Sequence, residues 1–237
     1  MDHHSALPRS VNKQFLFEEE VQNVRDVVLN LKDKWFDIKH TMLASTPTHT
    51  VGVNPYEHFA HFLGPSLYSM SGSNEYTDRY RKLAKEYNII LNNIFSKIYE
   101  RIRLAIEIEL KVPCVYKENT SLPGFHIFGH GLNAKPVQYN YFYTHQDSFP
   151  SNGLQMEGLA SIYSFIIPIQ NPKSGAKLEY LLDGQYKPYR YNEGELSYWE
   201  GTLPHRIGYF ELDGEDDYRI TWQIHVAVQQ GKGYIFW

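Results

Sequence analysis

The feature that most constrains the fold is the texture of the chain after Pro113. Short runs of apolar and aromatic residues alternate there with turns rich in glycine, proline and aspartate, and no helical period comes between them. The predicted strands are 125–128, 137–145, 160–169, 176–182, 195–199, 206–210 and 219–228. Closely spaced strands without intervening helices indicate an antiparallel sandwich or barrel.

The chain before Pro113 is predicted to contain helices that support this β structure. Apolar residues recur there at three- and four-residue steps in two stretches, which is typical of helices that bury one face. The first stripe is Val21, Val24, Val28, Leu31 and Trp35, and the second is Tyr80, Leu83, Tyr87, Leu91, Ile94, Ile98, Ile102 and Ala105. The second helix is too long to be a connector, so we expect it to lie across the outside of the sheet.

The predicted fold class is therefore α+β with a mainly β core. Proline and glycine residues interrupt 44–75, and His58–Pro65 within this loop either forms the wall or lid of a pocket or packs its own aromatic side chains onto the body. The expected organisation is one domain over residues 1–237, with a flexible lead-in at 1–15, helical support and pocket loops at 16–112, and the β core at 113–237.

Composition narrows the classes of partner. A net charge of −4 without a basic stripe argues against nucleic-acid binding, and no apolar run approaches the roughly 20 residues of a membrane span. The single cysteine, Cys114, excludes an intrachain disulfide and suggests a reducing compartment. No signal peptide is visible at the N-terminus. We therefore expect a cytoplasmic protein with a small-molecule substrate and no nucleic-acid or membrane partner.

One predicted strand ends in a pair of potential metal ligands. Residues at i and i+2 of an extended chain point to the same side, so His145 and Asp147 can present a nitrogen and a carboxylate oxygen to one point. Alone, this pair also fits a surface histidine beside a turn aspartate. A third ligand is available in His205, which opens a later strand 60 residues on (205 − 145 = 60). Two histidines and one carboxylate that leave open coordination positions are typical of non-haem Fe(II) sites.

The last predicted strand carries a second polar feature. Period-2 alternation places Arg219, Thr221, Gln223 and His225 on one face and Ile220, Trp222, Ile224 and Val226 on the other. A guanidinium is rarely buried without an anion. That anion is either a carboxylate of a bound small molecule, held by Arg219 with help from Thr221, or an inward-facing acidic side chain in a structural salt bridge.

The order and spacing of these pieces resemble a known family. His145-x-Asp147, then Gly194-Glu195-Leu196 leading to His205, then Arg219-x-Thr221 fourteen residues later (219 − 205 = 14), are similar to the motifs of Fe(II)/2-oxoglutarate-dependent oxygenases. The resemblance covers roughly residues 120–230 and identifies no subfamily. It implies a double-stranded β-helix core, a jelly-roll or cupin-like barrel.

The resemblance also implies the site's chemistry. His145, Asp147 and His205 would be the catalytic Fe(II) ligands, and Arg219 and Thr221 would hold the far carboxylate of 2-oxoglutarate. With O2, the cosubstrate would be decarboxylated to succinate while a C–H bond of the substrate is oxidised. Halogenating relatives carry glycine or alanine at the position of Asp147, so hydroxylation, desaturation or cyclisation is favoured over chlorination.

Further residues are candidates for the walls of the site. Tyr143 and Tyr141 share the face of His145, and they contact the cosubstrate or substrate or simply pack in the core. His126 is a candidate pocket residue, Arg206 a surface or substrate-side residue, and His225 a satisfied core histidine.

The leading hypothesis is an oxygenase acting on a small metabolite such as an amino acid or natural-product intermediate. Two alternatives stay open: a cupin-type metalloenzyme that does not use 2-oxoglutarate, and a non-catalytic small-molecule-binding protein on the same fold.

Overall fold

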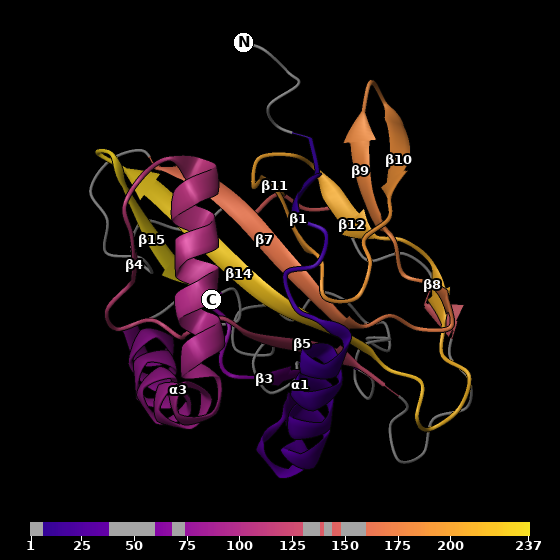
Figure 1. Cartoon of the computed structure of the whole chain (residues 1–237), viewed down its shortest axis with the longest axis horizontal. Helices are drawn as coiled ribbons and strands as arrows, with labels where there is room; N and C mark the ends of the chain where they lie inside the picture. Colours follow the sequence, from indigo (N-terminus) through magenta and orange to yellow (C-terminus); the bar gives the residue numbers. More distant parts are fainter. Residues whose placement is uncertain (1–6, 38–59, 68–73, 130–137, 140–143, 148–159) are drawn as a thin grey trace.

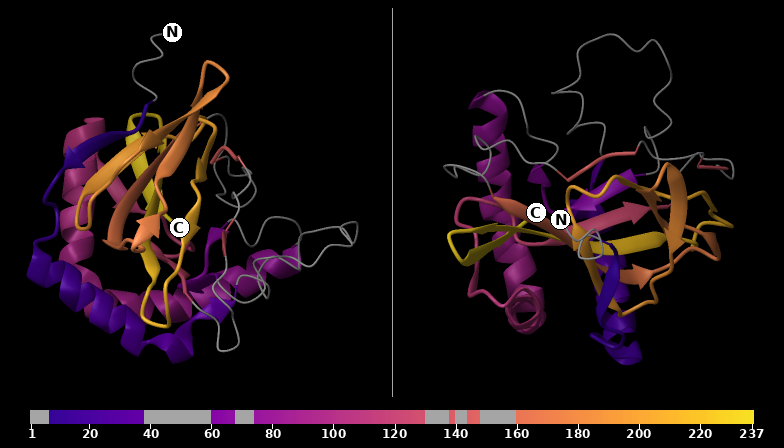
Figure 2. Two further views of the ribbon diagram at one scale, coloured as in Figure 1. Left: turned by 90° about the vertical axis from the view of Figure 1, so that its right-hand side faces the viewer. Right: turned by 90° about the horizontal axis from the view of Figure 1, so that it is seen from above.

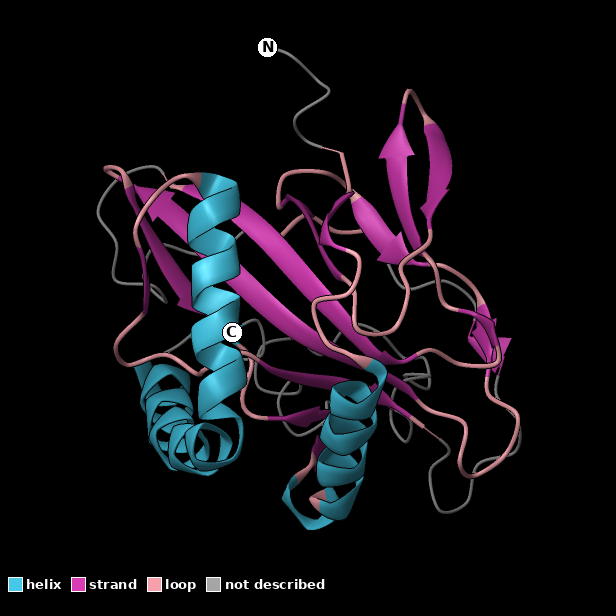
Figure 3. Cartoon of the chain, viewed as in Figure 1, coloured by secondary structure: helices cyan, strands magenta, loops and turns pink. Residues whose placement is uncertain are grey.

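The computed structural model describes residues 7–37, 60–67, 74–129, 138–139, 144–147 and 160–237. Strands are the most abundant regular structure in the described chain, and the helices lie in the N-terminal half (Figure 3). The helices are α1 (Glu18–Asn30), the 3-10 turn η2 (Lys32–Lys34) and α3 (Asn74–Leu110). The strands are β1 (Arg9–Asn12), β2 (Phe36–Asp37), β3 (Ala60–Leu63), β4 (Cys114–Tyr116), β5 (Gly124–Phe128), β6 (Gln138–Tyr139), β7 (Ser161–Gln170), β8 (Ser174–Gly175), β9 (Leu178–Leu182), β10 (Gln185–Tyr189), β11 (Leu196–Glu200), β12 (His205–Ile207), β13 (Phe210–Glu211), β14 (Arg219–Gln229) and β15 (Lys232–Phe236).

Strands from β5 onward alternate between two sides of a roll. One side is a sheet in the order β1-β11-β7-β14-β5-β3-β2, to which β15 and β4 add beside β14; the other consists of β10-β9-β12 and β6-β13-β8 (Figure 1). Side chains join the two sides, because Ile166 of β7 packs with Leu178 of β9, and Phe128 of β5 with Phe210 of β13. Alternation of this kind between facing antiparallel sheets is the jelly-roll arrangement. The predicted double-stranded β-helix is confirmed.

The central strand β14 shows why the fold has a polar interior. It runs antiparallel to both β7 and β5, so it is hydrogen-bonded on both edges. Its apolar residues Ile220, Trp222, Ile224 and Val226 are buried in the core that the helices cover, as the alternation predicts. The opposite face of the strand, which carries Arg219 and Thr221, therefore lines the inside of the roll.

The helices cover the outer face of the large sheet, as expected (Figure 2). Val21, Val24 and Val28 of α1 are buried in the same core. α3 is longer than its predicted stripe, and one member of that stripe was wrong. Ile94 is 42% exposed, whereas the neighbouring Phe95 is buried against Phe125 and Trp222.

Several strands escaped the sequence-based prediction. β1 lies within the expected unstructured lead-in and pairs with β11, and β3 lies within the expected loop 44–75 and pairs with β5. β10 and β15 were also missed. The strand predicted at 206–210 is divided into β12 and β13, which belong to different small sheets. None of the helices in the described part of the chain combines the length and apolar character of a membrane span.

Candidate metal centre

The backbone brings the two histidines together directly. His145 and His205 form an antiparallel bridge in which each N–H donates to the other's carbonyl oxygen, at 3.0 Å and 2.9 Å. Two residues further on, the Asp147 N–H donates to the Gly201 carbonyl at 2.7 Å. The segment that carries His145 and Asp147 is therefore hydrogen-bonded at both of these residues to the segment 201–205, which carries His205.

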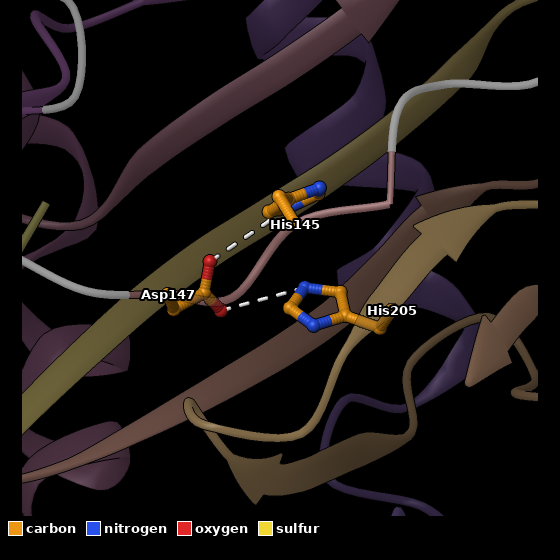
Figure 4. Close-up of side chains that lie close together, drawn as sticks. All are labelled: His145, Asp147 and His205. Carbon is orange, nitrogen blue, oxygen red and sulfur yellow. Dashed lines mark ion pairs between the residues drawn. The ribbon is translucent and has the colours of Figure 1, made fainter. Parts of the chain in front are cut away.

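The three side chains converge on one point (Figure 4). His145 Nε2 lies 3.7 Å from Asp147 Oδ1, and His205 Nε2 lies 3.5 Å from Asp147 Oδ2. One ligand atom from each residue lies within 4.8 Å of the others. Ligands about 2.1 Å from one metal ion at right angles would be about 3.0 Å apart, so the three side chains would draw together to bind one. Asp147 and His205 are buried, whereas the His145 side chain is 48% exposed.

The more buried of the two ligand histidines, His205, is already in the protonation state that a metal requires. His205 Nδ1 lies 2.8 Å from the Leu203 carbonyl oxygen, which accepts hydrogen bonds only, so Nδ1 carries the hydrogen and Nε2 presents its lone pair. Burial lowers the pKa of His205, although the charge of Asp147 opposes this. Trp199 packs edge-on against the ring. His205 is therefore a neutral, oriented ligand.

Asp147 is a buried carboxylate that remains ionised. Burial pushes its pKa upward, but His205, His225, His145 and a hydrogen bond from Ser164 outweigh burial, so the pKa lies below its ordinary value. An ionised oxygen between two imidazole nitrogens suits a divalent cation.

Close backbone packing behind Asp147 depends on a glycine. A Cβ atom added to Gly201 would lie 2.8 Å from the Asp147 carbonyl oxygen and 2.9 Å from Ile162 Cγ2. Only glycine lets the turn after β11 approach the ligand segment this closely.

The inward face of β14 holds an unpaired cation at its start. Arg219 is 1% exposed, and its two terminal nitrogens donate to hydroxyls, to Tyr191 at 2.9 Å and to Thr221 at 3.4 Å. Its Nε has no hydrogen-bond partner, and no carboxylate in the described part of the chain pairs with it. The structural salt bridge considered from the sequence is therefore absent among the described residues. A buried guanidinium held only by neutral groups is prepared for an external anion.

His126 lies between these two features. It pairs with Thr221 across β5 and β14 and stacks on Phe62 with ring centroids 4.5 Å apart. Its pKa is lowered well below the ordinary value by burial, then by the charges of Arg219, His225 and His145. Ser164 and His225 connect Asp147 to β14, the strand that also carries Arg219, so the metal ligands and Arg219 lie on one side of the large sheet.

The other predicted site residues are placed differently. Arg206 points away from the face of its neighbour His205; it donates to Glu179 Oε2 at 2.8 Å and stacks on Tyr186. A role for it with substrate stays a prediction. Tyr141 and Tyr143 lie outside the described residues.

Sequence reasoning missed two residues of the site and described a third correctly. Tyr191 bonds to Arg219, and Ser164 bonds to Asp147. His225 is the satisfied core histidine that was predicted, buried and 3.3 Å from Ser164. Ser164 had one available signal, since it is a polar residue at an inward position of the apolar strand β7. Tyr191 had none, because its partner is distant in sequence.

Comparisons with known proteins can be set beside this geometry. No protein-family model matches the sequence, and no curated protein is significantly similar to it. One similar solved structure is a Pseudomonas putida prolyl-4-hydroxylase, with 14% identity over 96% of this chain and 94% of that chain and a TM-score of 0.39. Another is the non-haem alpha-ketoglutarate-dependent epimerase SnoN from nogalamycin biosynthesis, with 9% identity over 97% of this chain and 81% of that chain and a TM-score of 0.47. A third is an N-substituted L-amino acid dioxygenase from Burkholderia ambifaria AMMD in complex with alpha-ketoglutarate (10%, 75% and 86%, 0.45).

The triad fits the metal site of the family that the sequence resembles. The jelly-roll topology and the assembled His145, Asp147 and His205 agree with the fold and the ligand set that the resemblance implies. They assign no subfamily.

Proposed function

We propose that this protein is an Fe(II)/2-oxoglutarate-dependent oxygenase that oxidises a C–H bond of a small metabolite. The observation that carries the proposal is the combination of two sites in one interior: a triad able to bind a metal, and a buried arginine without an acidic partner among the described residues. The triad would bind iron, and the arginine would bind the far carboxylate of a dicarboxylate cosubstrate.

The donor set supports iron with open positions. Structural zinc sites use four protein ligands, usually with cysteine, whereas this cluster offers three ligands and contains no cysteine. Two histidines and one carboxylate suit Fe(II) and leave positions for exogenous ligands. Asp147 fills the carboxylate position, which supports hydroxylation, desaturation or cyclisation over halogenation.

The anion end supports 2-oxoglutarate over a neutral cosubstrate. Arg219 offers its unpaired Nε and its terminal nitrogens, and Thr221 offers a hydroxyl beside them. A guanidinium binds a carboxylate at two points in a fixed plane. Tyr191 holds one terminal nitrogen of Arg219 from the side and thereby orients the plane.

The protein's own part in the reaction follows from these contacts. When bound, iron with 2-oxoglutarate and O2 supplies the oxidising power, with succinate and CO2 as by-products. His145, Asp147 and His205 would hold the metal, and Arg219 and Thr221 would orient the cosubstrate. Burial of Asp147 and His205 excludes water from one side of the centre, so access is from the side of the exposed His145 ring.

Anaerobic titration tests the proposal. Fe(II) followed by 2-oxoglutarate should give the visible metal-to-ligand charge-transfer band in wild-type protein and none in His145→Ala, because that variant lacks a ligand. Gln146→Ala is the matched control; it alters a neighbouring side chain that bonds to the Thr202 carbonyl and should retain the band.

The alternatives give different results. A cupin-type enzyme would bind metal but show no band with the keto acid. A binding protein would form no succinate from 2-oxoglutarate in the presence of iron and O2. Either result in fully metal-loaded wild-type protein would refute the oxygenase.

A further inference from the structure

A buried polar chain stands behind the carboxylate ligand. Ser164, at the centre of β7, donates a hydrogen bond from Oγ to Asp147 Oδ2. On its other side, Ser164 Oγ lies 3.3 Å from Nδ1 of His225, which is its partner across β7 and β14. Asp147 and His225 are each 3% exposed, and Ser164 is fully buried. The chain thus runs from the middle of the large sheet to the metal centre.

The direction of the hydrogen bonds along the chain is determined. The ionised Asp147 accepts only, so the single hydroxyl hydrogen of Ser164 points to Oδ2. Ser164 then has only lone pairs to offer to His225, so Nδ1 of His225 must carry a hydrogen. Each group donates towards the carboxylate.

This chain restricts how Asp147 can bind a metal. The bond from Ser164 occupies one lone pair of Oδ2 and fixes the rotation of the carboxylate plane. The two oxygens thus differ in their surroundings: Oδ2 accepts the bond from Ser164 and lies 3.5 Å from Nε2 of His205, whereas Oδ1 lies 3.7 Å from Nε2 of His145. A carboxylate held in this way favours binding to a metal through one oxygen rather than two. One-oxygen binding leaves an additional coordination position on the metal open, and a keto acid that binds through two atoms, together with O2, requires such positions.

We propose that Ser164 and His225 are positioning residues that hold Asp147 in a one-oxygen binding geometry. The inference rests on the metal centre of the proposed function. It assigns a role to two residues that do not touch the metal, and it explains a hydroxyl and an imidazole buried among the apolar residues of two central strands.

Binding of Co(II) to the metal-free protein tests this role without turnover. Ser164→Ala should bind Co(II) about 10- to 100-fold more weakly than wild type, the usual effect of removing a hydrogen bond to a metal ligand. Its visible d–d spectrum should also change, because a freely rotating carboxylate alters the coordination number. Ser197→Ala is the matched control. Ser197 is also a fully buried strand serine of the large sheet, but it bonds to Glu195 and Tyr189 rather than to the triad.

A second pair of variants keeps the test decisive if Ser164→Ala does not fold. His225→Asn retains an N–H donor near the position of Nδ1 and should preserve the wild-type Co(II) spectrum, whereas His225→Leu removes the donor and should alter it. A purely structural role would change the thermal stability of these variants but leave the spectrum of the bound metal unchanged.

The outcomes separate this inference from the proposed function. If wild-type protein binds no Co(II), the metal centre fails and this inference fails with it. If wild type binds Co(II) and both Ser164→Ala and His225→Leu show the same affinity and spectrum, only the positioning role is overturned.

Discussion

Replacing Arg219 by methionine should have opposite effects on cosubstrate binding and on stability. Methionine is similar in length and apolar, so it can fill the buried space beside Phe128 and Tyr191. Truncating one partner of a buried hydrogen-bonded charge pair costs about 2–5 kcal/mol. Since about 1.4 kcal/mol corresponds to a factor of ten, the affinity for 2-oxoglutarate should fall by about 30- to 5,000-fold.

The protein without ligand should respond in the other direction. Arg219 has no acidic partner among the described residues, so the unliganded protein bears the desolvation cost of the guanidinium without a compensating charge. Apolar replacement of buried charges is commonly neutral or stabilising by about 1–4 kcal/mol. We therefore expect the melting temperature of metal-free Arg219→Met to be equal to or higher than that of wild type.

Calorimetric titration of 2-oxoglutarate into Mn(II)-loaded protein without O2 measures the affinity, and thermal unfolding measures the stability. Arg206→Met is the control, because Arg206 bonds to Glu179 on the outer face and its loss should leave the affinity unchanged. Wild-type affinity in Arg219→Met would refute the assigned anion site. A large loss of stability in that variant would show that Arg219 has an internal partner instead.

Three further predictions follow from the packing. Gly201→Ala should weaken Co(II) binding about tenfold or more, because the added methyl group would lie 2.8 Å from the Asp147 carbonyl oxygen and must displace the backbone of this ligand. Unchanged affinity in a direct titration would contradict the close approach. Cys114 is buried, which raises the pKa of its thiol to about 11, so its reaction with a disulfide reagent should be slow at neutral pH and accelerate about tenfold per pH unit as the thiolate forms; fast stoichiometric labelling of folded protein at neutral pH would be inconsistent with this. Phe95→Ala should lower the free energy of unfolding by about 3–5 kcal/mol and the exposed Ile94→Ala by less than about 1 kcal/mol, as measured by urea unfolding; equal losses would place both side chains in the core.

The long strands and the ligand motif were predictable because local pattern determines them. In β14, strict alternation separated Arg219 and Thr221 from Ile220 and Trp222. The apolar face packs in the main hydrophobic core along its length, and the other face lines the inside of the roll. The cluster of His145, Asp147 and His205 was predictable because the two-residue spacing of the first pair combines with a later histidine in a recognisable family motif.

Features that depend on distant partners were not predictable in this way. β10 contains Pro188, and β15 begins beside a glycine-rich turn, so their pairing with β9 and β14 overrides weak strand propensity. Ile94 and Phe95 are adjacent on a helix, and only the position of the sheet decides which one is buried. The bond from Ser164 to Asp147 likewise exists only because β7 passes behind the ligand segment.

The bridge between His145 and His205 has a consequence for the chain as a polymer. The 59 intervening residues (146–204) include β7 to β11, so a metal bound by both histidines would act as a cross-link that closes a loop of about 60 residues. By the closure entropy of a covalent cross-link, such a loop is worth on the order of 4 kcal/mol. Affinity for the metal and integrity of this part of the roll are therefore thermodynamically linked, and any substitution that loosens the loop, however far from the ligands, would weaken metal binding.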